Sequence, residues 1–393
     1  MLSRLFAPSM PSSAKPSVWD IFCTVIENYG DIGVCWRLAR QLADEHGVHV
    51  RLWVDDLGAF QHLCSTINPS LEQQDADGVD VRHWPVDFPA IDPGDVVIEA
   101  FACRLPESFE AAMARRVPAP RWINLDYLSA EAWVSGCHAL PSPHPRLPLT
   151  KYFFFPGFDE TTGGLLRERD LVERRLSFCA SHAQQADFWQ RIGQTSSAAD
   201  ALLISLFAYE NPALPQLLEI WAAGAKPVCC VAPVTRTLPV IEAFAGRSLQ
   251  VGDTVRRGQL EIRLLPFVSQ ADYDRLLWLC DVNFVRGEDS FVRAQWAARP
   301  MLWHIYPQDD DAHLVKLAAF LDLYCAKMPE EAARTVRRLT TAWNRGQQIS
   351  SEVWAAYVSF LPDLQKQAVV WEKIRSKQED LCSSLVRFCR STL

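Results

Sequence analysis

The chain has 393 residues, with 39 basic and 47 acidic side chains and a formal net charge of −8. Because domains average about 150 residues, this length predicts two domains or one large one. Hydrophobic residues make up 49% of the chain and aromatic residues 11%, which excludes disorder as the main state. The acidic balance argues against non-specific binding to nucleic acid.

The cysteines and the amino-terminal segment predict the compartment. The chain has 12 cysteines, most of them in apolar runs and none in a C-x-x-C pair, so we expect small buried side chains and no zinc site. Residues 1–17 lack the apolar run of a signal peptide, and no stretch approaches the roughly 20 apolar residues of a membrane span. We therefore expect a cytoplasmic protein without membrane contact.

The first half opens with a βαβ pattern. It consists of a strand at 18–26, a loop at 27–33, a helix at 34–45 and a strand at 48–54. The right-handed crossover of such a unit places the loop at the carboxyl edge of a parallel sheet. Further strands are expected at 95–100 and 121–124. Four prolines within 140–148 indicate an extended connection rather than a helix or an inner strand.

The second half repeats this architecture. Strands are expected at 201–207, 227–231, 260–265, 282–285 and 301–306, and helices at 212–223, 271–280 and 291–298. Residues 163–199, which connect the halves, are charged and then polar, with 194–199 as a hinge or surface turn. After Pro329 the pattern is helical, and it ends in an amphipathic segment over 364–389.

These patterns predict an α/β protein built from two doubly wound sheets. The expected domains are residues 18–185 and 198–363, and the helical end, 364–393, could pack back on the first domain. Ligands of open α/β sheets bind outside the carboxyl ends of the strands, so the candidate site is a cleft lined by strand-to-helix turns.

The first such turn, Glu27 to Gly33, carries two carboxylates and no GxGxxG fingerprint. Glu27 and Asp31 are four residues apart, and the glycines permit a tight turn, so both acids can converge on one point to take a proton or bind a cation. Acids here would repel a pyrophosphate. The alternative is that Asp31 only caps the following helix, which would explain one acid but not the pair.

The second turn, Arg286 to Ser290, lies between an apolar strand and a helix. Its backbone N–H groups and Arg286 could receive a diphosphate, and Glu288 could bind a ribose diol. Alternatively, Asp289 and Ser290 only cap the helix. Phe267 and Gln270 follow another strand, where they could stack on a base and bind its edge, although such a Phe is more often part of the core.

Two Asp-x-Asp pairs resemble the metal-binding motif of some sugar transferases. They are Asp75 with Asp77 and Asp272 with Asp274. The second pair opens a helix, where residues i and i+2 do not face each other, and we expect both pairs to be surface acids rather than a metal site.

Two long strings of residues then point to a family. Residues 20–42 with 52–57, and residues 286–295 with 303–308, resemble the bacterial elongation factor P arginine rhamnosyltransferases of the EarP type. Further matches at 99–103, 127–131 and 140–143 extend the resemblance over most of the chain, from Asp20 to about Lys316.

The resemblance implies a GT-B architecture, in which two Rossmann-like domains face each other across a cleft. It also implies transfer of rhamnose, with inversion, from dTDP-β-L-rhamnose to an arginine of elongation factor P, which relieves ribosome stalling at polyproline. No metal and no other cofactor is expected, and no nucleic acid or membrane partner.

The resemblance also implies roles for individual residues. By matching position, Phe267 and Gln270 would hold the thymine and Glu288 the ribose, while Asp289, Ser290 and Arg286 would lie at the diphosphate. Tyr209 would be a further contact, and Asn28, Tyr29 and Gly30 would belong to the substrate site. Asp31 would be the base or the orienting carboxylate. Family members carry Asp where this chain has Glu27, which keeps the carboxylate but lengthens the side chain.

Two other functions remain open from the sequence. One is a GT-B enzyme with a different nucleotide sugar or a small-molecule acceptor. The other is a non-catalytic two-domain binding module, which would not need the pair of acids in the first turn.

Overall fold

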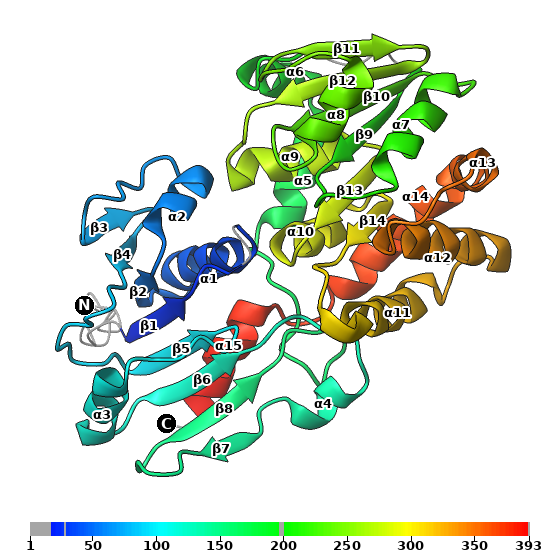
Figure 1. Cartoon of the computed structure of the whole chain (residues 1–393). Helices are drawn as coiled ribbons and strands as arrows, with labels where there is room; N and C mark the ends of the chain where they lie inside the picture. The colour runs from blue at the N-terminus through cyan, green and yellow to red at the C-terminus, as the bar shows by residue number, and fades with distance from the viewer. Residues whose placement is uncertain (1–16, 27–28, 196–199, 392–393) are drawn as a thin grey trace, which may run out of the picture.

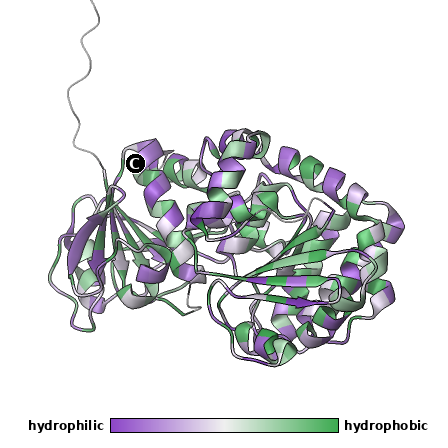
Figure 2. Ribbon diagram, turned by 90° about the horizontal axis from the view of Figure 1, so that it is seen from above, coloured by the Kyte–Doolittle hydropathy of each residue, from purple (hydrophilic) through white to green (hydrophobic). Residues whose placement is uncertain are grey.

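The computed structural model describes residues 17–26, 29–195 and 200–391. Two mainly parallel sheets form two α/β halves that lie side by side, the first in blue to teal and the second in green to yellow (Figure 1). Hydrophobic residues follow the central strands, and the surrounding helices have mixed faces (Figure 2). This arrangement confirms the predicted α/β class with two sheets.

The first sheet has eight strands in the order β3-β4-β2-β1-β5-β6-β8-β7, and only the edge strands β3 and β7 are antiparallel to their neighbours. Its strands are β1 (Val18–Cys23), β2 (His49–Val54), β3 (Gln73–Ala76), β4 (Val79–His83), β5 (Val96–Ala100), β6 (Arg121–Leu125), β7 (Pro141–Pro143) and β8 (Thr150–Phe154). The proline-rich segment therefore forms a short edge strand, where a missing N–H costs little.

The second sheet has six strands in the order β11-β12-β10-β9-β13-β14, with β11 antiparallel at one edge. Its strands are β9 (Leu202–Leu206), β10 (Val228–Pro233), β11 (Thr254–Arg257), β12 (Leu260–Leu265), β13 (Val282–Arg286) and β14 (Met301–His304).

Helices connect and cover the sheets. They are α1 (Gly30–His46), α2 (Leu57–Leu63), α3 (Glu107–Arg115), α4 (Trp133–Cys137), α5 (Leu171–Ala180), α6 (His182–Arg191), α7 (Leu214–Ala223), α8 (Leu238–Ala245), α9 (Gln270–Leu279), α10 (Asp289–Ala297), α11 (Ala312–Cys325), α12 (Glu330–Asn344), α13 (Ser351–Ser359), α14 (Leu361–Arg375) and α15 (Leu381–Ser391), with a 3-10 turn at Asp309–Asp311.

Each sheet has a point at which the strand order changes direction. In the first sheet β1 lies between β2 and β5, and in the second β9 lies between β10 and β13. Strands that leave such a point on opposite sides open a crevice at their carboxyl ends, which is where ligands of this fold class bind. The loops after β1, β9 and β13 therefore surround the candidate site.

Two helices begin earlier than the sequence predicts. Helix α1 begins at Gly30 rather than at residue 34, and α10 begins at Asp289 rather than at residue 291. These two helices pack against each other, and Gly33 in the first turn of α1 lies next to Asp289, the first residue of α10. Tertiary contact therefore extends both helices into segments that their glycine and acidic residues mark as loops.

The connection between the halves contains two helices that were not predicted from its polar composition. Helices α5 and α6 lie within the segment predicted as charged and polar, and residues 196–199 of the predicted hinge lie outside the described residues. Each helix buries a narrow apolar stripe, with Phe178 in α5 and Phe188 in α6 packed at a ring distance of 5.9 Å. A stripe this narrow leaves the average composition polar.

The helical end of the chain divides its contacts between the two halves. It is not one segment but two helices, of which α14 packs on α10 of the second half and α15 on α1 of the first. Phe388 of α15 meets the rings of Tyr152 and Phe154 on β8, and α15 lies beside β6 and β8 (Figure 1). The exact domain boundaries stay predictions.

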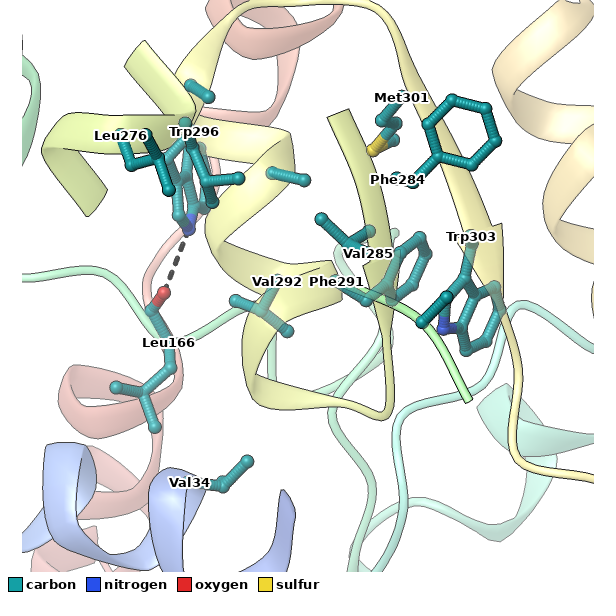
Figure 3. Packing of buried hydrophobic residues seen from close by; sticks show 14 of the residues in the cluster. Val34, Leu166, Leu276, Phe284, Val285, Phe291, Val292, Trp296, Met301 and Trp303 are labelled. Atoms are coloured by element: carbon teal, nitrogen blue, oxygen red, sulfur yellow. Dashed lines mark hydrogen bonds between the residues drawn. The ribbon is translucent and has the colours of Figure 1, made fainter. Parts of the chain in front are cut away.

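A continuous apolar core joins the halves around α10. Phe291 stacks on Trp303 at 3.8 Å, and the indole N–H of Trp296 donates to the carbonyl oxygen of Leu166 at 2.9 Å (Figure 3). Leu166 belongs to the chain that leaves the first half, so α10 is fixed from both sides. Among the described residues, no helix is both long and apolar enough to cross a membrane.

Candidate functional site

A pocket lies between the two halves at the carboxyl ends of the strands. It takes Tyr29, Gly30 and Leu63 from the first half and residues that follow β9, β10, β12 and β13 from the second. The predicted site residues that line it are Tyr29, Gly30, Tyr209, Phe267, Gln270, Arg286, Asp289 and Ser290. We call it the first pocket.

Arg286 brings a positive charge into this pocket between aromatic rings. Its guanidinium carbon lies 4.5 Å from the ring centre of Phe207 and 4.7 Å from that of Tyr209, and the residue is 5% exposed. Burial, reinforced by the charge of Arg286, lowers the pKa of the neighbouring His304 to about 3, which keeps that imidazole neutral. A cation held in apolar surroundings is suited to an anionic ligand.

Two aromatic rings from different halves meet at the mouth of the first pocket. Phe267 and Tyr29 have ring centres 4.8 Å apart and planes tilted by 48°. Tyr29 also touches the imidazole of His62 edge-on. A base that stacks on Phe267 would share this ring with Tyr29 or displace it.

Gln270 and Asp289 connect the halves by hydrogen bonds. The amide nitrogen of Gln270 donates to the Gly33 carbonyl at 3.0 Å and to Asp289 Oδ2 at 3.1 Å, and its oxygen accepts from Arg40 at 2.8 Å. Asp289 Oδ1 accepts from Nε of Arg37 at 2.7 Å. Both side chains are therefore already engaged with the first half in this arrangement.

The same contact continues into a buried ion cluster of Arg37, Glu168, Asp274, Asp289 and Arg293. Asp274 accepts from Arg37 at 3.1 and 3.2 Å and from Arg293 at 2.7 and 2.9 Å. Glu168 pairs with Arg293 at 2.8 Å and with Arg37 at 3.7 Å. Burial opposes ionisation of Glu168, but Arg293 and Arg37 outweigh it and lower the pKa of this carboxyl to about 2.

Asp274 corrects one sequence prediction. We expected both acids of its Asp-x-Asp pair to lie on the surface, but Asp274 is 2% exposed and lies at the centre of the ion cluster. Asp272, two residues earlier, bonds instead to Arg191 and Arg275 on the outer side of α9. The helical geometry that argues against a metal pair also turns one of the two inward.

Gly33 permits the close approach of α1 and α10. A Cβ atom at this position would lie 3.1 Å from Oδ2 and 3.2 Å from Cβ of Asp289. These separations are tighter than normal van der Waals contact. A side chain there would press the Arg37–Asp289 contact apart.

The capping alternative for the second turn is wrong. The residue before α10 is Glu288, whose side chain makes no capping hydrogen bond. The Ser290 hydroxyl instead accepts from the backbone N–H of Arg286 at 3.1 Å and bonds back to its carbonyl. Ser290 therefore fastens the first turn of α10 to the end of β13.

The capping alternative for Asp31 is also wrong. Asp31 lies inside the first turn of α1, is 2% exposed, and its Oδ2 accepts from the Ile26 N–H at 3.1 Å. Its Oδ1 accepts from the Tyr127 hydroxyl at 3.3 Å. Glu27 and Asn28 lie outside the described residues, so the convergence of Glu27 with Asp31 stays a prediction.

A second pocket adjoins the first at Gly287. Glu288 lies here rather than in the first pocket, and its Oε2 accepts from the Leu128 N–H at 2.9 Å. The second pocket is lined by Ile26, Tyr127, Gly287, Glu288, Trp303, Ile305, Tyr306, Pro307, Gln308 and Lys316. Both groups that donate to Asp31 in the bonds above, Ile26 and Tyr127, belong to it.

Sequence reasoning identified Gln270 and Asp289 but missed the other residues that join the halves. Arg37 stands between two apolar positions of the predicted helix, and a charge on a buried face is a detectable signal. Its partner Asp289 is 252 residues away, however, and no local pattern connects them. Tyr127 and Leu128 belong to residues 127–131, which contribute to the family resemblance, but nothing in that string marks a bond to Asp31 or Glu288.

The cysteine prediction agrees with the structure at most positions. Nine of the cysteines are buried, Cys64 and Cys137 are partly buried and Cys179 is exposed. Burial raises the pKa of thiols such as Cys103 and Cys230, which makes them inert. Within the described residues no three His, Cys, Asp or Glu side chains are grouped so that they could hold a metal ion.

Comparison with known proteins identifies relatives along nearly the whole chain. The model of the family described as "Elongation-Factor P (EF-P) rhamnosyltransferase EarP" matches residues 19–390. A protein of Pseudomonas putida named protein-arginine rhamnosyltransferase is 50% identical over 96% of this chain and 100% of its own length. One of the same name from Pseudomonas aeruginosa is 50% identical over 94% of this chain and 98% of its own.

Solved structures agree in fold. A structure described as "Structural basis for EarP-mediated arginine glycosylation of translation elongation factor EF-P" is 38% identical to this chain, with a TM-score of 0.68, over 96% of this chain and 100% of that one. A UDP-glucosyltransferase from Polygonum tinctorium, at 10% identity and a TM-score of 0.52, shares the fold alone. The expected GT-B architecture is confirmed.

The ion cluster predicts how stability depends on pH. The pKa of Glu168 is lowered from its ordinary 4.5 to about 2 in the folded protein, so its contribution is present above pH 4.5 and is lost as the pH falls toward 2. We expect Glu168→Gln to be less stable than the parent at pH 7. Between about pH 5 and about pH 3 its melting temperature should fall less than that of the parent, because the variant has no Glu168 carboxylate to protonate.

The control for this prediction is Glu107→Gln, because the Glu107 side chain is 91% exposed and pairs only at 3.7 Å with Arg146. Its melting temperatures should follow the parent at every pH. Parallel curves for the parent and Glu168→Gln would contradict the prediction.

Proposed function

This chain belongs to the EarP family of elongation factor P rhamnosyltransferases, and from that premise we propose that it transfers rhamnose from dTDP-β-L-rhamnose to one arginine of translation elongation factor P, with inversion at the anomeric carbon. One observation carries the proposal above all: 50% identity over nearly the full length of two proteins named protein-arginine rhamnosyltransferase. The two adjoining pockets fit a reaction with two substrates.

The first pocket suits the nucleotide. Arg286 supplies a positive charge, and the amino end of α10 offers backbone N–H groups that lack helical partners, so together they can receive a diphosphate. We propose that the thymine stacks on Phe267 and bonds to Gln270, and that Tyr209 and Ser290 line this pocket. Glu288 lies in the adjoining second pocket, next to Gly287, and we propose that it binds the ribose from there. Because Gln270 and Asp289 now bond across the halves, donor binding would exchange some of these hydrogen bonds.

The acceptor chemistry needs a carboxylate that can reach the guanidinium. A guanidinium has a pKa above about 12, so no ordinary carboxylate can remove its proton beforehand. We propose that Asp31, together with Glu27, grips the guanidinium by hydrogen bonds and turns one nitrogen toward the anomeric carbon. The carbon–nitrogen bond forms as the carbon–oxygen bond to dTDP breaks, and the proton passes to a carboxylate while dTDP leaves.

The acceptor also defines the setting of the reaction. Elongation factor P acts in translation, so we propose that this protein works in the cytoplasm and that the transferred rhamnose activates the factor for relief of stalling at polyproline. Arg286 and the amino end of α10 can meet the charge of the leaving dTDP, so we propose transfer without a metal or other cofactor.

The direct test is transfer itself. We expect that incubation of the protein with dTDP-β-L-rhamnose and elongation factor P adds one deoxyhexose residue to the factor, read by intact mass and located on an arginine by fragmentation. The matched control is the factor with that arginine replaced by lysine, which should gain no mass. An unchanged mass of the unaltered factor would refute the proposal.

A panel of nucleotide sugars tests the alternative of a GT-B enzyme with a different donor. Ligands that bind only the folded state raise its melting temperature, so dTDP and dTDP-rhamnose should stabilise the protein and UDP- or GDP-sugars should not. Stabilisation by another nucleotide sugar alone would favour that alternative.

Two variants separate chemistry from donor binding. Asp31→Asn keeps the size of the side chain but removes its charge, so we expect transfer to fall at least about 100-fold while the dTDP dissociation constant changes less than about threefold. Asp289→Ala removes the link between Arg37 and Gln270, so we expect weaker dTDP binding. Titration calorimetry and initial rates measure both effects, and the reverse pattern would contradict these roles.

Chelation tests the metal-independent reaction. Because protein groups can meet the leaving-group charge, we expect the same initial rate with excess EDTA as without it. A loss of activity that added Mg²⁺ or Mn²⁺ restores would show that a metal takes part.

A further inference from the structure

We propose that Tyr127 is a positioning residue for the transfer reaction, which its hydroxyl group serves by fixing the carboxylate of Asp31. The inference rests on the proposed function, because it assigns Asp31 to the acceptor. It goes beyond the roles assigned above, none of which includes the segment after β6.

Asp31 is held by hydrogen bonds to both carboxylate oxygens. Its two oxygens have different donors: the Ile26 N–H donates to Oδ2 at 3.1 Å and the Tyr127 hydroxyl to Oδ1 at 3.3 Å. The terminal torsion of an aspartate is broad, so the orientation of the carboxylate plane is set by the groups that bond to it. The hydrogen bond from Tyr127 is one of these and restricts the rotation.

Two groups pack against the ring of Tyr127. Its ring stacks on Phe101 with centres 4.6 Å apart and planes within 24°, and the ammonium of Lys316 lies 5.6 Å from the ring centre. Phe101 and Ala102 both have φ of 55°, a left-handed conformation that costs free energy for residues with a side chain. Two successive residues thus adopt a strained backbone conformation at the position where the Phe101 ring packs on Tyr127.

The next residue, Leu128, contacts the second half. The Leu128 N–H donates to Oε2 of Glu288 at 2.9 Å, and Glu288 belongs to the second half. The segment after β6 therefore contacts both the acid proposed for the acceptor and the acid proposed for the ribose. A change in its position would alter the placement of the two acids relative to each other.

Tyr127 belongs to the second pocket and not to the first. Tyr127 and Ile26 line the second pocket and not the first, whereas Phe267, Gln270 and Arg286 line the first. Removal of the Tyr127 hydroxyl therefore takes no group from the first pocket, and it keeps the Leu128 N–H that bonds to Glu288. We expect this loss to lower the rate of transfer and to leave dTDP binding unchanged.

The test is Tyr127→Phe, which removes the hydroxyl and keeps the ring on Phe101. We expect kcat to fall about tenfold, in line with the loss of one hydrogen bond to a charged acceptor. The dTDP dissociation constant and the melting temperature should stay within error of the parent. Tyr152→Phe is the matched control, because it removes a phenol from β8, where its ring meets Phe388 of α15, and should leave every parameter unchanged.

A second variant approaches the same contact from the other side. Phe101→Leu leaves the tyrosine hydroxyl in place and removes the ring that supports it, so we expect a smaller loss of kcat, about threefold, again at constant donor affinity. This measurement keeps the proposal open to refutation if Tyr127→Phe is poorly folded.

Three outcomes would overturn the inference. They are a parental kcat in Tyr127→Phe, a parental kcat in Phe101→Leu when the first variant does not fold, and a loss of kcat matched by equal losses of donor affinity and melting temperature, which marks a merely structural role. Absence of rhamnose transfer by the parent protein would instead refute the proposed function, and the inference with it.

Discussion

The buried guanidinium of Arg37 is the contact on which the arrangement of the two halves depends. It is 3% exposed and takes Asp289 from α10 and Asp274 from α9, while its own helix, α1, carries Asp31 in its first turn. A buried charge without a partner costs several kcal/mol, so separation of the halves must expose these groups to water or leave them unpaired. The pairing of these charges therefore requires that the two halves stay in contact. Gly33 makes this contact sterically possible because it has no side chain.

This constraint couples the proposed nucleotide pocket to the packing of the halves. Gln270 and Asp289 line the pocket and at the same time bond to Gly33 and Arg37. A ligand that takes hydrogen bonds from either side chain would compete with these contacts between the halves. A substitution in the ion cluster would therefore alter the affinity for the proposed donor without touching the nucleotide.

Local patterns predicted the central strands and the two main turns because apolar periodicity and glycine are visible within a short window. They did not predict β3, β4, β7, β8 or β11, which lie at or next to a sheet edge. The loops after β1 and β13 follow from that pattern, and most of the site residues predicted there line one pocket. The early start of α1 and the inward turn of Asp274 could not be predicted, because both depend on a partner from the other half. Tyr127 was missed for a related reason: its bond to Asp31 joins residues 96 positions apart.

The division into two pockets depends on a single backbone turn. Gly287 has φ of 59°, a conformation that glycine adopts without strain and other residues rarely adopt, and it borders both pockets. On one side of it Arg286 enters the first pocket, and on the other Glu288 enters the second. The proposed inversion requires that the incoming nitrogen and the leaving diphosphate lie on opposite sides of one carbon. The two pockets meet at Gly287, so a leaving group beside Arg286 in the first pocket and an acceptor in the second would approach the same carbon from different directions.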